Sequence, residues 1–249
     1  MKIIISGAMG HMGKTVAEQA AQAGMEIAFG VDIAAGEMPY PLYHSFDEAP
    51  ASEDAVIIDF SKPDGLTALL AYAVKHHVPC VLCTTGYTAE QEKQVEEASK
   101  QIPVFRSANM SIGIALLRQL ARKAAQVLGD AYDVEIVEMH HRRKADAPSG
   151  TALMLYNAVA DAYDEPRNMV CGRSGNSCKR THNEIGMHSV RGGTVAGEHQ
   201  VLFLGEAERV TVSHSAENRS VFAIGALRAA AFLAEKPAGR YDMDDLIAD

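Results

Sequence analysis

Short apolar segments alternate with amphipathic segments along the first hundred residues. The apolar segments have the length of buried strands and lie at residues 2–6, 25–31, 55–60, 78–83 and 104–107. Between them, apolar residues recur at helical spacing over residues 14–23, 66–75 and 88–99. We expect Ser61 to cap the second helix and Thr88 to open the third with a capping box. This alternation predicts an α/β fold, a doubly wound parallel sheet with helices on both faces.

The pattern changes after residue 108. Residues 112–128 form one long amphipathic segment whose apolar stripe we assign to Ile114, Leu117, Leu120 and Ala121. A strand over 132–139, a helix over 149–163 and three strand-like segments at 187–191, 198–204 and 208–214 follow, while 164–183 is polar and predicted to be irregular. Residues 220–235 are helical in pattern and are expected to return to the first sheet. We therefore predict one domain from 1–108 with 218–249, and an α+β domain with a mixed sheet from 109–217.

The first strand is followed by a glycine-rich turn, Gly7-Ala8-Met9-Gly10-His11-Met12-Gly13, and then by a helix. Glycines allow a tight turn and a close approach of the main chain to a pyrophosphate, which the N–H groups of the helix start attract. Asp32 ends the next strand, at the place where an acidic residue binds a ribose hydroxyl. No arginine follows Asp32, so the sequence favours NADH, although His11 and Lys14 leave NADPH possible. In parallel sheets ligands bind at the carboxyl ends of the strands, which adds Cys83, Thr84 and Thr85, and then Ser107, Ala108, Asn109 and Met110.

A second candidate site lies at residues 138–152, E-M-H-H-R-R-K-A-D-A-P-S-G-T-A. The chain has a formal charge of −9, so this cationic cluster reverses the local sign and suggests a small anionic ligand. Histidines exchange protons near neutral pH, and strand alternation predicts that His140 and His141 point to opposite faces. The helix start at Ser149-Gly150-Thr151 offers N–H groups to a carboxylate, and Lys144 or a histidine suits a second one. Arg142 and Arg143 are either ligands or solvated surface charges.

Charge and composition restrict the other classes of function. An acidic chain argues against a nucleic-acid partner, and no apolar run approaches the ~20 residues of a membrane helix, so we expect a cytoplasmic protein. Cys80 and Cys83 are spaced C-x-x-C, but their strand-like surroundings favour buried structural thiols over a redox or zinc pair. Cys171 and Cys178 lie in a polar loop and could pair. We expect no metal site, because no other histidine stands at metal-ligand spacing from His140 and His141.

Several motifs occur in an order that covers nearly the whole chain. They are the glycine-rich turn, Asp59-Phe60-Ser61, Thr84-Thr85-Gly86, residues 138–152 and Gly197-Glu198-His199. Together they resemble the 4-hydroxy-tetrahydrodipicolinate reductase (dihydrodipicolinate reductase) family. The resemblance implies a Rossmann-like dinucleotide-binding domain, a substrate-binding and tetramerisation domain, and a homotetramer. It also implies the NAD(P)H-dependent reduction that yields tetrahydrodipicolinate on the route to diaminopimelate and lysine.

The same resemblance implies roles for individual residues. His140 corresponds to the proton donor and Lys144 to a second donor, while His141, Gly150 and Thr151 correspond to contacts with a substrate carboxylate. Cofactor contacts are implied for Gly7, Ala8, Met9, Gly10, His11, Met12, Asp32, Cys83, Thr84, Thr85, Ser107, Ala108, Asn109 and Met110. Taken without the resemblance, the residues also allow another NAD-dependent dehydrogenase of a small amino or keto acid, or a non-catalytic protein that senses NADH.

Overall fold

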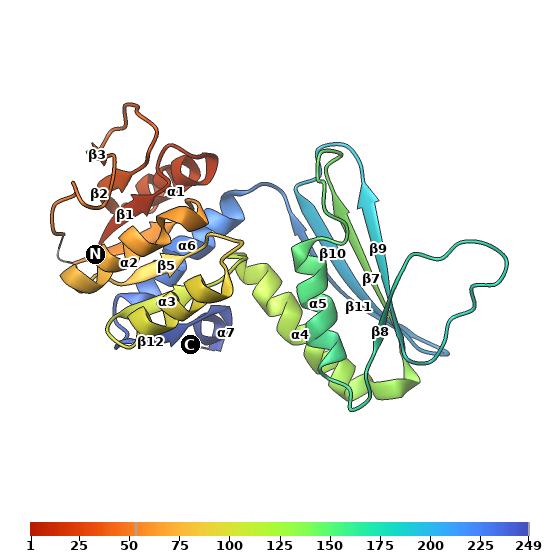
Figure 1. Ribbon diagram of the computed structural model, residues 1–249. Coiled ribbons are helices and arrows are strands. Elements are labelled where there is room, and N and C mark those ends of the chain that lie inside the picture. Colours follow the sequence, from red (N-terminus) through yellow and green to blue (C-terminus); the bar gives the residue numbers. More distant parts are fainter. Residues whose placement is uncertain (53, 249) are drawn as a thin grey trace. The chain divides into compact units, whose positions relative to one another are not determined.

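The computed structural model describes residues 1–52 and 54–248. The chain forms two compact units, which are described separately below (Figure 1). Unit 1 consists of Met1–Ile112 together with Arg219–Asp249, and unit 2 consists of Gly113–Asn218. The chain therefore leaves unit 1, builds unit 2 and returns to complete unit 1.

Unit 1 contains a seven-stranded sheet in the order β12-β6-β5-β4-β1-β2-β3. All its strand pairs are parallel, as the sequence predicted. The strands are β1 (Lys2–Ser6), β2 (Glu26–Val31), β3 (Leu42–Tyr43), β4 (Ala55–Asp59), β5 (Cys80–Leu82), β6 (Pro103–Arg106) and β12 (Gly239–Tyr241). The edge strands β3 and β12 were not predicted, because two or three residues are too few to show a periodic pattern.

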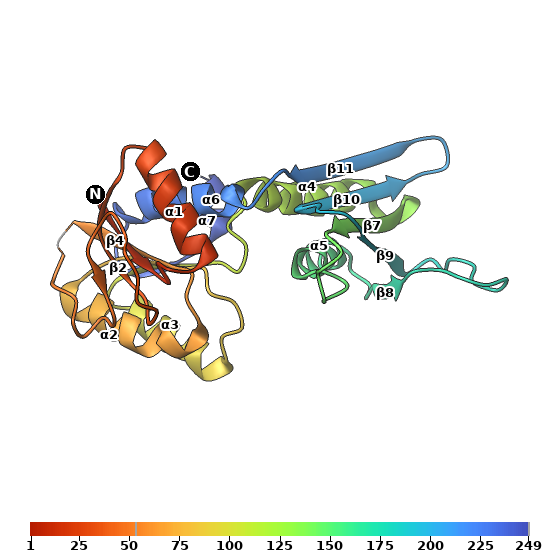
Figure 2. The same cartoon turned by 90° about the horizontal axis from the view of Figure 1, so that it is seen from above.

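Helices cover both faces of this sheet (Figures 1 and 2). The helices are α1 (His11–Gln22), α2 (Leu66–His76), α3 (Ala89–Ser99), α6 (Ser220–Leu233) and α7 (Met243–Ala248). Ile4 packs in a core cluster with residues of α2 and α3, and its neighbours Ile3 and Ile5 are equally buried. Helix α6 contacts α1, β4, β5 and β6, so the predicted return of the chain to the first sheet is confirmed.

Two helix starts were predicted from capping residues, with different outcomes. Thr88 accepts a hydrogen bond from the N–H of Gln91, whose side chain accepts one from the N–H of Thr88, so the capping box is confirmed. The prediction for Ser61 is wrong. Pro63 opens a separate 3-10 turn, Pro63–Gly65, and this turn moves the start of α2 to Leu66. The Ser61 hydroxyl instead donates to the carbonyl of Lys62.

Unit 2 contains a mixed five-stranded sheet in the order β11-β10-β7-β9-β8. Its strands are β7 (Asp133–His140), β8 (Asn168–Cys171), β9 (Glu184–Arg191), β10 (Gly197–Leu204) and β11 (Arg209–Ala216). The central strand β7 pairs in parallel with β9 and antiparallel with β10. Strand β8 corrects the prediction that residues 164–183 are irregular, since this four-residue edge strand pairs with β9.

One face of the unit 2 sheet packs against α4 (Ile112–Leu128) and α5 (Gly150–Ala160). Alternate residues of β7 supply the core, and Val134 and Ile136 are buried. On α4, Ile114, Leu117 and Ala121 are buried as predicted. Leu120 is 47% exposed, so it lies beside the buried stripe, which continues through Ala125 instead.

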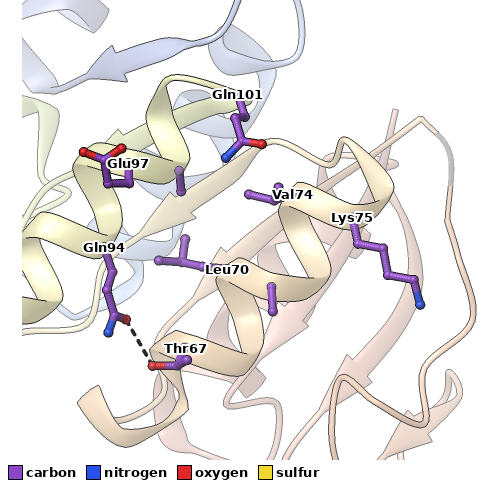
Figure 3. Close-up of a pocket in the computed structure, with 9 residues that line it drawn as sticks. Thr67, Leu70, Val74, Lys75, Gln94, Glu97 and Gln101 are labelled. Carbon is purple, nitrogen blue, oxygen red and sulfur yellow. Dashed lines mark hydrogen bonds between the residues drawn. The ribbon is translucent and has the colours of Figure 1, made fainter.

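A shallow groove lies on unit 1 between α2 and α3 (Figure 3). Leu70 and Val74 line one side, and a hydrogen bond of 3.0 Å joins Thr67 to Gln94 across it. None of the residues predicted to bind a ligand lines this groove. Among the described residues, no helix is both long and apolar enough to cross a lipid bilayer.

Candidate functional site

The candidate site of unit 2 lies at the end of β7, on the face that packs against α4 and α5. The register places Glu138 opposite Ser189 on β9 and His199 on β10. Two residues further along β7, His140 lies opposite Arg191 on β9. Because side chains alternate along a strand, Glu138 and His140 share one face of the sheet. The fold thus brings the carboxylate and imidazole of Glu138 and His140 on β7 together with the guanidinium of Arg191 on β9.

Glu138 is completely buried and accepts hydrogen bonds from Arg191, Ser149, His140 and Ser189. Arg191 donates to both carboxylate oxygens, at 2.8 and 2.7 Å, and the main-chain N–H of Ser149 donates to Oε1 at 3.2 Å. The Nδ1 atom of His140 lies 2.5 Å from Oε2. Burial alone would raise the pKa of Glu138, but the hydrogen bonds from Arg191, Ser189 and His140 lower the pKa to about 2. The carboxylate therefore stays charged at neutral pH.

This contact determines how His140 carries its proton. A carboxylate only accepts hydrogen bonds, so Nδ1 donates its hydrogen to Glu138, and Nε2 is the nitrogen available for proton exchange. Burial lowers the pKa of His140, Glu138 counteracts this effect, and the charges of Lys144 and Arg191 lower the pKa further. A Cβ atom at Gly197 would lie 3.1 Å from Nε2, so the glycine keeps space open at this nitrogen.

The loop after β7 carries the other predicted cations. Lys144 forms an ion pair of 2.8 Å with Asp146, whose carbonyl accepts a hydrogen bond from Arg191 at 2.7 Å. His141 lies beyond the last residue of β7, so strand alternation does not determine its direction, and the opposite orientation of His140 and His141 stays a prediction. Arg142 and Arg143 are exposed.

The start of α5 adjoins the same network. Ser149 is the N-cap residue, and its hydroxyl accepts a hydrogen bond from the N–H of Ala152 at 3.2 Å. The hydroxyl also contacts Nε2 of His199 at 3.2 Å. Burial and the neighbouring His140 lower the pKa of His199 to about 4, so this imidazole is neutral at neutral pH. Gly150 and Thr151 form the first turn of α5, where main-chain N–H groups favour an anion.

Two residues of this network, Arg191 and His199, lie outside the site predicted at residues 138–152, and Glu138 lies inside it but was given no role of its own. Glu138 precedes His140 by two positions, and this strand spacing was a usable signal. Arg191 lies 53 positions from Glu138, and nothing in the local sequence indicates their contact. The pairing of β7 with β9 is what brings them together.

The candidate site of unit 1 begins at the turn between β1 and α1. Gly7 has φ +79°, and a Cβ atom there would lie 2.8 Å from the carbonyl oxygen of Phe60. A Cβ atom on Gly13 would lie 2.2 Å from the carbonyl oxygen of Gly7, so only glycine allows this close packing of turn and helix. Asp32 accepts hydrogen bonds from the N–H groups of Met9 at 2.8 Å and Ala34 at 2.9 Å. The turn, the helix start and the acidic residue fit a dinucleotide.

The remaining predicted cofactor residues follow β5 and β6. Parallel strands end at the same edge of a sheet, so residues 83–85 and 107–110 lie along the edge that carries residues 7–12. Thr84 is buried, and its hydroxyl donates to the buried carboxylate of Asp59 at 2.7 Å. Cys83 and Met110 are also buried, whereas Thr85 and Ala108 are exposed. A ligand at this edge would therefore contact the main chain of Cys83, Thr84 and Met110 and not their side chains.

The cysteines give no sign of a reactive or metal-binding pair. Cys80 and Cys83 are free and buried, and burial raises the pKa of each thiol, which favours the structural interpretation. Cys171 and Cys178 are free and exposed. Within residues 1–52 and 54–248, no group of three or more His, Cys, Asp or Glu side chains is placed to hold a metal ion.

Comparisons with known proteins cover almost all of the chain. Residues 1–110 match the family described as "Dihydrodipicolinate reductase, N-terminus", and residues 113–247 match "Dihydrodipicolinate reductase, C-terminus". The chain belongs to the dihydrodipicolinate reductase family. The N-terminal match lies within unit 1, whereas the C-terminal match spans unit 2 and the returning residues 219–247 of unit 1.

Curated relatives agree with membership of the dihydrodipicolinate reductase family. The chain is 45% identical over 248 residues to the 4-hydroxy-tetrahydrodipicolinate reductase of Clostridium novyi, with 99% of this chain and 98% of the relative covered. It is 47% identical to the enzyme of that name from Caldanaerobacter subterraneus subsp. tengcongensis, with the same coverage. A solved structure of dipicolinate-bound dihydrodipicolinate reductase from Paenisporosarcina sp. TG-14 has a similar fold, with TM-score 0.78, 23% identity and 97% of both chains covered.

Proposed function

We propose that this protein is a reductase that converts 4-hydroxy-tetrahydrodipicolinate to tetrahydrodipicolinate, using NADH or NADPH, in the synthesis of diaminopimelate and lysine. Full-length membership of the dihydrodipicolinate reductase family supports this reaction. The observation in this chain that carries the proposal is the contact between Glu138 and His140 beside the start of α5. It combines a proton-exchanging group with an anion-binding turn, which suits reduction of a dicarboxylate.

The residues of unit 2 have separate tasks in this reaction. Nε2 of His140 donates a proton to the reduced ring, and Lys144 serves as a second donor after it leaves Asp146. Gly150 and Thr151, at the start of α5, bind one substrate carboxylate, with His141 as a further contact. Lys144 and Arg191 add positive charge, which stabilises a dianionic substrate. Bound substrate raises the pKa of His140 because its carboxylates favour the imidazolium.

Unit 1 is proposed to bind the nucleotide. When bound, the nicotinamide supplies the hydride. The main chain of residues 7–12 approaches the pyrophosphate, and residues 83–85 and 107–110 contribute further main-chain contacts. The carboxylate of Asp32 accepts hydrogen bonds from the ribose hydroxyls, and its charge repels a 2′-phosphate. We therefore propose that NADH is preferred and NADPH is used less efficiently.

We also propose a cytoplasmic homotetramer assembled through unit 2. The face of its sheet opposite α4 and α5 carries apolar side chains that are only partly buried, among them Val137, Met139 and Val190. Val190 is 41% exposed. Apolar side chains on an open sheet face are typical of surfaces that another chain covers. Sedimentation of the purified protein measures the assembly directly, and a monomer at micromolar concentration contradicts this part of the proposal.

A coupled assay tests the reaction itself. Freshly made 4-hydroxy-tetrahydrodipicolinate is added with NADH or NADPH, and the loss of reduced nucleotide is followed. Turnover with a higher kcat/KM for NADH is expected. Turnover only on other amino or keto acids indicates a different dehydrogenase, and nucleotide binding without turnover indicates a sensor. A higher kcat/KM for NADPH shows that the interpretation of Asp32 is wrong.

A further inference from the structure

We propose that Glu138, held by Arg191, is a positioning residue that fixes the proton donor His140 and the carboxylate-binding start of α5 relative to each other. This inference rests on the proposed function, because it assigns His140 and α5 the roles described there. It adds two residues that neither the motifs nor the family match assign to the reaction.

The carboxylate of Glu138 is saturated with hydrogen bonds. A carboxylate offers about four acceptor positions, two on each oxygen. Oε1 accepts from Nη2 of Arg191 and from the N–H of Ser149, and Oε2 accepts from Nη1 of Arg191 and from Nδ1 of His140. Glu138 is also completely buried. It therefore acts on the reaction only through the groups that it holds.

Glu138 holds two groups in place, the imidazole of His140 and the N–H of Ser149 at the start of α5. Nδ1 of His140 must carry a hydrogen to donate to Glu138, which leaves Nε2 as the atom that loses or gains the proton. The N–H of Ser149 belongs to the residue that caps α5, so its bond to Glu138 fixes the first turn of the helix. One rigid carboxylate thus sets the spacing between proton donor and anion site. Errors of about 1 Å in such spacing are costly in catalysis.

Arg191 also binds a second acceptor, in the loop after β7. Its guanidinium also donates to the carbonyl of Asp146 at 2.7 Å, and Asp146 pairs with Lys144. Arg191 consequently connects the strand that carries His140 with the loop that carries the second proposed donor. A guanidinium is suited to this because its planar fork holds several acceptors at once.

The charged and titratable groups around His140 come from every element that packs against it. They are Glu138 on β7, Arg191 on β9, Lys144 on the following loop and His199 on β10, whose ring lies 5.2 Å from that of His140. Glu138 is the only anion of this set. Its removal should disfavour the imidazolium, because the remaining neighbours are cationic or neutral.

Nitrogen NMR of the histidine rings tests the inference without any substrate. The ring-nitrogen signals of His140 are identified as those that disappear in His140→Asn. In the wild-type protein these signals should show that the hydrogen is on Nδ1. In Glu138→Gln this preference should weaken, and the pKa of His140 should fall by about 1–3. Glu135→Gln is a matched control, since Glu135 lies on the same strand and contacts Arg173, Arg180 and His188 instead. An unchanged tautomer and pKa in Glu138→Gln overturn the inference.

Kinetics provide a readout that a purely structural role would not move. In Glu138→Gln, kcat should fall about tenfold or more, part of the ~10²–10⁴-fold that a general acid contributes. A general acid works only when protonated, so the decline of kcat at high pH should move to lower pH. KM for the substrate should also rise, because α5 loses an anchor. A lower kcat with an unshifted pH profile and unchanged KM contradicts a positioning role.

A double variant distinguishes the loss of positioning from simple unfolding. Glu138→Gln leaves the partly buried charge of Arg191 without its partner, which is destabilising. In the double variant Glu138→Met with Arg191→Met both charges are replaced by apolar groups, a change that folded proteins often tolerate. It should fold and still lose the Nδ1 tautomer. If wild-type protein shows that tautomer yet turns over no dicarboxylate, the proposed function fails while the positioning of His140 stands.

Discussion

The two units build their candidate sites from different parts of the chain. In unit 1 the proposed nucleotide site consists mainly of main chain, and the side chains of Cys83, Thr84 and Met110 are buried. In unit 2 the site consists of side chains, with the buried Glu138 and His140 at its centre. A main-chain site depends on glycines and strand ends, whereas a side-chain site depends on the register of several strands. Substitutions should therefore affect the two sites in different ways.

The largest effect is expected in unit 2 from His140→Asn. Asparagine keeps a polar group near Glu138 but cannot exchange a proton at neutral pH. We expect kcat to fall by about 10²–10⁴-fold with a smaller change in KM for the substrate. Steady-state kinetics with the dicarboxylate at saturating NADH measure this, and near-normal kcat rules out His140 as the proton donor.

In unit 1, Gly7→Ala should have the next largest effect. The φ of +79° and the approach to Phe60 both disfavour a side chain, so we expect a loss of about 1–3 kcal/mol in the free energy of unfolding and a raised KM for NADH. Gly24→Ala is a matched control. Gly24 has φ +68° but no atom within 4 Å of a Cβ, so it should cost stability without changing the KM for NADH. Equal KM in both variants contradicts a main-chain nucleotide site.

Thr151→Val tests the anion site of unit 2 with a smaller change. Valine keeps the shape of threonine but removes its hydroxyl. A hydrogen bond to a charged group contributes about 1.5–3 kcal/mol, so KM for the substrate should rise about tenfold or more while kcat changes little. Thr67→Val, on α2 of unit 1, provides the comparison and should leave KM unchanged. An unchanged KM in Thr151→Val would exclude this hydroxyl from substrate binding.

Alkylation of the cysteines should show no effect on activity. Burial raises the pKa of Cys80 and Cys83, so their thiols stay protonated at pH 8, and only the exposed Cys171 and Cys178 should react with iodoacetamide. Mass spectrometry of the labelled peptides identifies the modified residues. Rapid labelling of Cys83 in folded protein contradicts its structural role in unit 1.

The same contrast explains how far the sequence predicts the structure. The order of strands and helices in unit 1 follows from local periodicity, and so does the position of the glycine-rich turn. In unit 2, periodicity predicts β7 and α5 but not the pairing of β7 with β9, on which the contact of Glu138 with Arg191 depends. Leu120 was assigned to the wrong part of the α4 surface because α4 also carries large apolar residues outside its buried stripe, where Leu116 is 50% and Leu120 47% exposed.

The path of the chain through unit 1 affects how the protein folds during synthesis. Helix α6 packs on β4, β5 and β6, yet it leaves the ribosome only after all of unit 2. At about 5–20 residues per second, the roughly hundred residues of unit 2 take on the order of 5–20 s to translate. For that time the nascent sheet lacks the helices α6 and α7 and the edge strand β12. A chaperone that binds exposed apolar surface would find its target in this interval, before unit 1 can close.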